Sequence, residues 1–295
     1  MRYHTPESFE DAAAIAASAT GVTRFLAGGT DVLVQLRSDM VTPDDLIDIK
    51  RIAGADAITQ NADGSWHIGA AVPSAAMHEH AALKAAWPGV VEAADLIGST
   101  QVQGRCTLAG NLCNGSPAAD SVPAMIAAGA SVSVVGPNGA RQIAVEDIPV
   151  SPGKTSLTKG EVVTGVTLPA SGANSGDAYL RFIPRTEMDI AVVGCAVCLT
   201  RDGATITSAR VALGAVAPTA RLVAEAAEVL VGSTLDEAAL DALGKAAEAA
   251  CKPITDKRGT IKFRTHVAGV LAKRAAQIAY DRAGGAEHDP RNHNC

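Results

Sequence analysis

Apolar positions in the first part of the chain alternate between the spacing of helices and that of strands. Ser8 is placed to cap an alanine-rich helix that continues to about Ala19, and Gly21 separates this helix from an apolar strand over 22–26. A helical turn is predicted at 32–37. Further apolar runs predict strands at 46–49, 66–70, 131–135 and 161–168, and helices over 73–97 and 118–129. The strand at 66–70 begins a second unit.

A change in pattern near residue 171 divides the chain. Residues 171–176 are small and polar, which indicates a linker. Three strands are predicted after it, at 178–183, 190–200 and 205–213, and helices follow, one opened by the capping-box residues 234–237 and the last covering 260–282. Strands followed by helices are typical of an α+β unit. We therefore expect a domain over 1–172, with subdomains of about 1–55 and 56–172, a second domain over 177–283, and a disordered tail over 284–295.

Composition narrows the functional classes. The 295 residues are 47% apolar, but no apolar run approaches the roughly 20 residues that cross a bilayer. A net charge of −6 and 3% aromatic residues argue against a nucleic-acid partner, which needs a basic face and stacking platforms. The N-terminus is acidic and does not resemble a secretion signal. A cytoplasmic protein is expected.

Motifs that suggest metal or nucleophilic chemistry fail on closer inspection. Cys195 and Cys198 have the spacing of a redox or cluster motif, but they lie in an apolar run typical of a buried strand, where positions three apart face opposite sides. His78 and His80 are two apart on a helix and do not face each other. Gly153 lacks the preceding glycine of a phosphate-binding P-loop. We therefore predict no metal site and no catalytic acid, base or nucleophile.

Two glycine-rich segments about eighty residues apart point to a cofactor instead. The first covers Leu26–Asp31, and the second covers Thr107–Pro117 and is expected to be a long loop without regular secondary structure. Glycine allows positive φ and close approach of a ligand, and successive amides in such turns form an anion site. Two such sites suit the diphosphate of a dinucleotide. Neither segment has the spacing of a Rossmann crossover.

At these segments the chain resembles the FAD-binding medium subunit of the molybdenum hydroxylases, the xanthine dehydrogenase and carbon monoxide dehydrogenase group. The resemblance covers about residues 1–282. It is carried by residues 27–30 (AGGT), 107–111 (TLAGN), 116–120 (SPAAD) and 185–191 (RTEMDIA) in this order. It implies an α+β protein: a two-subdomain FAD-binding fold of the vanillyl-alcohol-oxidase type plus a smaller C-terminal α+β domain.

The resemblance also implies which residues bind FAD. Residues 26–31 would wrap the diphosphate, residues 107–113 would continue the grip, and the segment at 97–98 would lie near the flavin ring. Three single residues would also bind the cofactor: the carboxylate at 120 by hydrogen bonds, and positions 163 and 181 beside the flavin ring. The implied cofactor-binding residues are Arg24, Leu26, Ala27, Gly28, Gly29, Thr30, Asp31, Ile97, Gly98, Thr107, Ala109, Gly110, Asn111, Cys113, Asp120, Val163 and Arg181.

The resemblance further implies partners and a redox role. In this family a large subunit carries the molybdenum cofactor and a small subunit carries 2Fe–2S clusters, so this chain would pass electrons from those clusters through FAD to NAD⁺, oxygen or a quinone. No histidine is placed for a covalent flavin bond, which implies dissociable FAD. Thr30 stands where carbon monoxide dehydrogenases have histidine, which argues against that substrate. A self-sufficient flavoprotein oxidase or dehydrogenase is the alternative, and a non-catalytic protein that lost the cofactor is a third reading.

Overall fold

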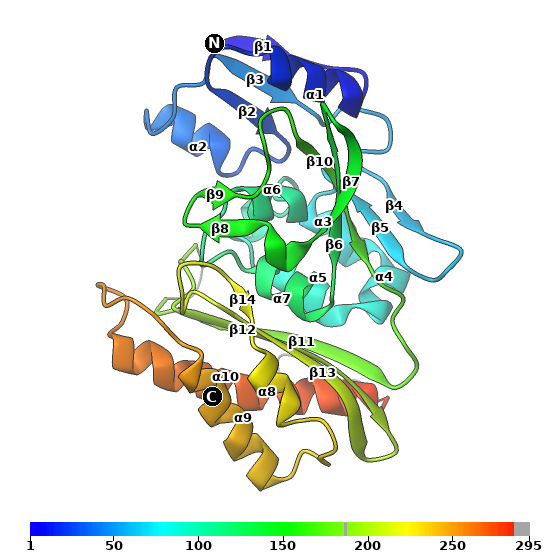
Figure 1. Cartoon of the computed structure of the whole chain (residues 1–295), viewed down its shortest axis with the longest axis vertical. Coiled ribbons are helices and arrows are strands. Elements are labelled where there is room, and N and C mark those ends of the chain that lie inside the picture. The colour runs from blue at the N-terminus through cyan, green and yellow to red at the C-terminus, as the bar shows by residue number, and fades with distance from the viewer. Residues whose placement is uncertain (186–187, 286–295) are drawn as a thin grey trace.

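The computed structural model describes residues 1–185 and 188–285, and it begins with a small parallel sheet (Figure 1). Its strand order is β1 (Arg2–His4), β3 (Asp45–Asp48), β2 (Thr23–Leu26). Helix α1 (Phe9–Ser18) starts as predicted, because the Ser8 hydroxyl accepts a hydrogen bond from the Asp11 amide at 3.0 Å. The short helix α2 (Val32–Arg37) follows β2 and has no buried residue.

A second, antiparallel sheet forms the centre of the first 170 residues (Figure 1). Its order is β4 (Ile58–Gln60), β5 (Trp66–Gly69), β10 (Val162–Leu168), β6 (Ser131–Gly136), β7 (Gly139–Ala144). The helices of this part are α3 (Ser74–Glu79), α4 (Ala81–Ala86), α5 (Pro88–Asp95), α6 (Leu108–Cys113) and α7 (Ser121–Ala127), with 3-10 turns at Thr100–Val102 and Val145–Asp147. A hairpin of β8 (Pro149–Ser151) and β9 (Lys154–Thr155) lies before β10.

A third sheet with three helices follows in the described residues between 175 and 285. The strand order is β11 (Ser175–Phe182), β12 (Val193–Asp202), β13 (Thr205–Gly214), β14 (Arg221–Leu222). Figure 1 shows α8 (Ala224–Glu228), α9 (Glu237–Ala249) and α10 (Ile261–Ala283) on the side of this sheet that faces away from α5 and α7. In the described ranges no helix combines the length and the apolar character needed to cross a membrane.

The third sheet packs on both faces. Tyr179 and Ala196 belong to the same apolar core as α5 and α7, whereas Ala178 and Cys195 pack into a second core with α9 and α10. Cys198 contacts the first core, so the two thiols of the Cys-x-x-Cys spacing lie on opposite sides of β12, as predicted. The fold class is confirmed: mixed helix and sheet, with a larger N-terminal part and a smaller α+β part.

Several expectations about elements were wrong in detail. The helix predicted over 118–129 is α7, only seven residues long, and strand β11 begins inside the predicted linker, at Ser175. Asp236, rather than Thr234, caps α9, because its carboxylate accepts from the Ala239 amide at 2.9 Å. The short strands β1, β4, β7, β8, β9 and β14 have no clear apolar pattern and were not anticipated. Of the predicted tail, residues 286–295 lie outside the described residues, and Gly284 ends α10.

The contact between β11 and α5 gives the chain a pH-dependent stability through Asp177. Asp177 on β11 is buried, which raises the pKa of its carboxyl to about 6, and its Oδ2 accepts from the Val90 amide at the start of α5. The folded state therefore holds this proton more tightly than the unfolded chain. The contribution to the free energy of unfolding is greatest below pH about 4 and falls by up to about 3 kcal/mol as the pH rises through about 6.

We expect Asp177→Asn to remove this fall. Chemical unfolding of the full chain at several pH values between about 4 and 7 measures the slope. Asp241→Asn is the matched control, because the Asp241 carboxylate is exposed and Lys273 lowers its pKa. An Asp177→Asn variant with the wild-type slope would contradict the assignment.

Candidate functional site

The first glycine segment is a tight turn between β2 and α2. Gly29 has φ +83°, which favours glycine. A Cβ on Gly28 would lie 1.7 Å from the carbonyl oxygen of Arg105, so only glycine lets this turn approach the chain before the second segment. The first segment therefore packs closely against the backbone of Arg105 and Cys106, which leads into the second segment.

The second segment is helical where a loop was expected. The Thr107 hydroxyl accepts from the Gly110 amide at 2.9 Å and opens α6. Asn111, in the middle of this helix, accepts from the Ser121 amide and hydroxyl through Oδ1, at 3.2 and 2.7 Å. The expectation of a long irregular loop was wrong because a capping threonine was not weighed against the glycines that follow it.

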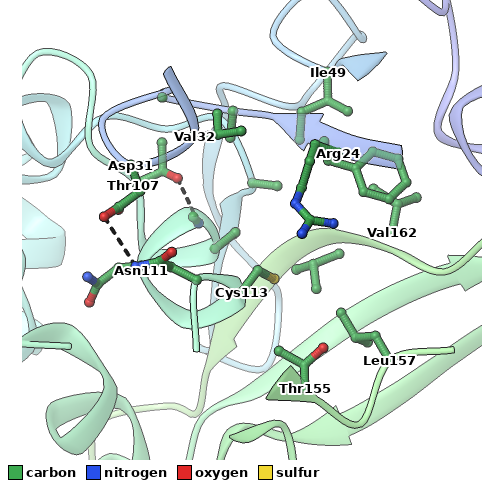
Figure 2. A pocket seen from close by; sticks show the side chains of 18 of the residues that line it. Arg24, Asp31, Val32, Ile49, Thr107, Asn111, Cys113, Thr155, Leu157 and Val162 are labelled. Atoms are coloured by element: carbon green, nitrogen blue, oxygen red, sulfur yellow. Dashed lines mark hydrogen bonds between the residues drawn. The ribbon is translucent and has the colours of Figure 1, made fainter. Parts of the chain in front are cut away.

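Side-chain hydrogen bonds join the two segments. Asn114 Nδ2 donates to Asp31 Oδ1 at 3.2 Å, and Gln35 Nε2 donates to Asn114 Oδ1 at 3.1 Å. Figure 2 shows Asp31 and Thr107 on one side of the cavity that both segments line. This cavity has a volume of about 600 Å³, which is within the usual range of ligand sites.

Thirteen of the seventeen predicted cofactor residues line this one cavity. They come from β2 and the first segment, from the end of the α5 region, from the second segment and from β10. They are Arg24, Ala27, Gly28, Gly29, Thr30, Asp31, Ile97, Thr107, Ala109, Gly110, Asn111, Cys113 and Val163.

The other four predicted residues lie beside the cavity. Leu26 is buried in the protein interior and Gly98 follows Ile97 in a turn with φ +68°. Asp120 and Arg181 form a buried ion pair at 2.7 Å, in which Arg181 Nη1 also donates to the Leu96 carbonyl. Their direct contact with a cofactor stays a prediction.

Burial changes the acidity of two carboxyls here. It raises the pKa of Asp120 to about 6, although Arg181 and the Tyr179 hydroxyl both act in the opposite direction. It also raises the pKa of Asp31. Arg181 therefore favours the ionised form of Asp120, because burial without this cation would strongly disfavour the carboxylate charge.

Sequence reasoning missed one wall of the cavity. This wall runs from the β8–β9 hairpin to the start of β10, and Figure 2 shows Thr155, Leu157 and Val162 from it. Gly153 and Lys159 also line the cavity. Gly153 does not match a P-loop and carries no other signal in the sequence. The Lys159–Gly160 pair before a strand does carry one, since glycine beside a cation is typical of anion sites.

Comparison with known proteins decides the family. Residues 1–171 match the model of the FAD binding domain in molybdopterin dehydrogenase, and residues 178–279 match the CO dehydrogenase flavoprotein C-terminal domain. The chain belongs to the FAD-binding medium subunits of the molybdenum hydroxylases. The resemblance expected from the sequence is confirmed, and FAD is the family's cofactor in this chain type.

Relatives of this family match almost end to end. The carbon monoxide dehydrogenase medium chain of Afipia carboxidovorans is 34% identical over 95% of this chain and 97% of the relative. The xanthine dehydrogenase FAD-binding subunit of Escherichia coli O157:H7 is 29% identical over 96% of this chain and 97% of the relative. A solved carbon monoxide dehydrogenase from Hydrogenophaga pseudoflava superposes with a TM-score of 0.91 at 33% identity, over 96% of this chain and 98% of that chain.

The cavity fits the FAD expected of such a medium subunit. Among the described residues, no protein acceptor takes the main-chain amides of Gly28, Gly29 and Thr30, and all three residues line the cavity. The buried Thr23 hydroxyl in the same wall has no partner within the described part of the chain. The Arg24 guanidinium points into the cavity (Figure 2) and takes part in none of the ion pairs between described residues. Unsatisfied donors and a free cation suit a diphosphate.

Proposed function

We propose that this chain is the electron-transfer subunit of a heterotrimeric molybdenum hydroxylase. It receives electrons from 2Fe–2S clusters of a small partner subunit, a large partner subunit carries the molybdenum cofactor, and the electrons leave to NAD⁺, oxygen or a quinone. The supporting observation is that both glycine segments line one cavity, and that the amides of Gly28, Gly29 and Thr30 have no acceptor among the described residues. Bound FAD supplies the chemistry, because it exchanges single electrons with clusters and electron pairs with small acceptors.

The chain's own residues bind and orient this cofactor. The amides of Gly28–Thr30 and those at the start of α6 would hold the diphosphate, and Arg24 would add a positive charge. Ser121 donates to the side-chain carbonyl oxygen of Asn111, so the Asn111 Nδ2 would be available to donate to the cofactor. Binding is non-covalent, and the bound FAD dissociates without breaking a bond to the protein.

The cavity lining favours electron transfer over the self-sufficient oxidase. A flavoenzyme that oxidises an organic substrate by itself commonly needs a proton acceptor beside the flavin. Among the lining residues, the carboxylates are Asp31, bonded to Asn114, and Glu161, held by Arg141 through contacts of 2.7 and 2.9 Å. That pairing lowers the pKa of Glu161 to about 2, which makes it a poor base near neutral pH.

The proposal predicts dependence on partners. The full chain, tagged and purified from its own cells, is expected to elute with a larger and a smaller subunit, with molybdenum, iron and flavin in the same fractions. In rapid mixing, the reduced small subunit is expected to bleach the flavin absorbance of this chain. A chain that elutes alone with flavin and oxidises organic substrates unaided would favour the self-sufficient enzyme instead.

A further inference from the structure

One strand of the C-terminal part contacts the cofactor-binding part through three successive inward-facing side chains. Asp177, Tyr179 and Arg181 alternate along β11, so they share one face. Asp177 accepts from the Val90 amide at 3.0 Å, and the other two both donate to Asp120. Each of the three side chains on this face of β11 therefore makes a hydrogen bond to the cofactor-binding part.

The Asp120 carboxylate is fixed by two donors from this strand. The Tyr179 hydroxyl donates to Oδ1 at 3.0 Å and Arg181 Nη1 donates to Oδ2 at 2.7 Å. Because each oxygen has its own donor, both the position and the plane of the carboxylate are set. Gly194 on the neighbouring strand makes room for this arrangement, since a Cβ there would lie 2.6 Å from the Tyr179 hydroxyl.

Both Asp120 and Arg181 are connected to residues that line the cavity. Ser121, the residue after Asp120, donates twice to Asn111, which lines the cavity. Arg181 donates to the carbonyl of Leu96, and the next residue, Ile97, also lines the cavity. A change in the position of Asp120 is therefore transmitted to Asn111 through Ser121 and its hydrogen bonds, and to Ile97 through Arg181 and the Leu96 carbonyl.

We infer that Tyr179 is a positioning residue of the FAD site, which acts by orienting Asp120. This inference rests on the proposed function and on the prediction that Asp120 and Asn111 bind the cofactor. Arg181 supplies the charge that keeps Asp120 ionised, and the hydrogen bond from Tyr179 sets the orientation of the Asp120 carboxylate. In the simpler reading Tyr179 only fills the core between the two parts of the chain, where its ring is buried.

Removing a single hydroxyl separates these readings. Tyr179→Phe keeps the buried ring and deletes the hydrogen bond to Oδ1. Tyr280→Phe is the matched control in the same part of the chain, because the Tyr280 hydroxyl donates to the Ala204 carbonyl at 2.7 Å, far in sequence from the site residues. The full chain is freed of FAD, and its dissociation constant for FAD is measured by flavin fluorescence, together with the visible circular dichroism of the bound flavin.

We expect Tyr179→Phe to raise the dissociation constant about tenfold, the effect of losing one hydrogen bond to a charged group. Its flavin dichroism is expected to change, whereas Tyr280→Phe leaves both readouts at wild-type values. In an Asp120→Ala background, Tyr179→Phe is expected to change the dissociation constant less than about twofold, since no carboxylate remains to orient.

The possible failures are distinguishable. A wild-type chain that binds no FAD overturns the proposed function and this inference together. A wild-type chain that binds FAD, with Tyr179→Phe equal to Tyr280→Phe in affinity and dichroism, overturns the inference alone. If Asp120→Ala does not fold, the comparison of the two tyrosine variants still decides between positioning and core packing.

Discussion

Gly28→Ala is expected to weaken FAD binding about a hundredfold and to lower the free energy of unfolding by about 2 kcal/mol. The added Cβ would lie 1.7 Å from the Arg105 carbonyl oxygen and 2.6 Å from its carbon, both backbone atoms that no side-chain rotation can move. One glycine segment must therefore shift against the other. Because their amides face a single cavity, the shift separates donors that act together. Fluorescence titration with FAD and urea unfolding measure the two effects.

Gly104→Ala is the matched control for this variant. Gly104 lies one residue before Arg105, and a Cβ there would meet no heavy atom within 4 Å. This control is expected to bind FAD as the wild type does. Equal FAD affinity in Gly28→Ala and Gly104→Ala would show that the contact between the two segments does not shape the site.

Arg181→Met is expected to destabilise the FAD-free chain by about 3–5 kcal/mol, because it leaves the buried Asp120 carboxylate without its cation. The side chains of Arg181 and Asp120 are only 7% and 10% exposed, so water cannot replace the lost partner. Unfolding in urea near neutral pH measures the loss. The loss is expected to shrink as the pH falls, because removal of Arg181 raises the pKa of Asp120 above its wild-type value of about 6, and a protonated carboxyl no longer needs the cation.

A second substitution tests this explanation. Asp120→Asn combined with Arg181→Met removes both charges, and we expect the double variant to recover a large part of the lost stability. Additive losses in the double variant would mean that Arg181 acts through its contact with the Leu96 carbonyl or through packing, and not through the charge of Asp120.

The sequence allowed the long elements and the two glycine segments to be predicted, because their signals are local. Ser8 caps a helix as expected, the last helix begins within one residue of its predicted start, and β12 is apolar over most of its length. Glycines at 28 and 29 indicated a turn open to a ligand, and the structure places them in a cavity wall. Local patterns of this kind survive folding because tertiary contacts reinforce them.

Contacts between distant residues could not be predicted in the same way. The steric requirement at Gly28 depends on Arg105, and the orientation of Asp120 depends on Tyr179, 59 residues away. The wall from Gly153 to Val162 reaches the cavity only because the β8–β9 hairpin precedes the central strand β10. Neither a short hairpin nor an interdomain hydrogen bond leaves a periodic trace in the sequence.

A crystal structure of the full chain with FAD bound tests the central claim most directly. The account predicts the diphosphate between the amides of residues 28–30 and the first turn of α6, with the Arg24 guanidinium beside it. A diphosphate bound away from either segment, or amides of the two segments turned from a common ligand, would contradict it.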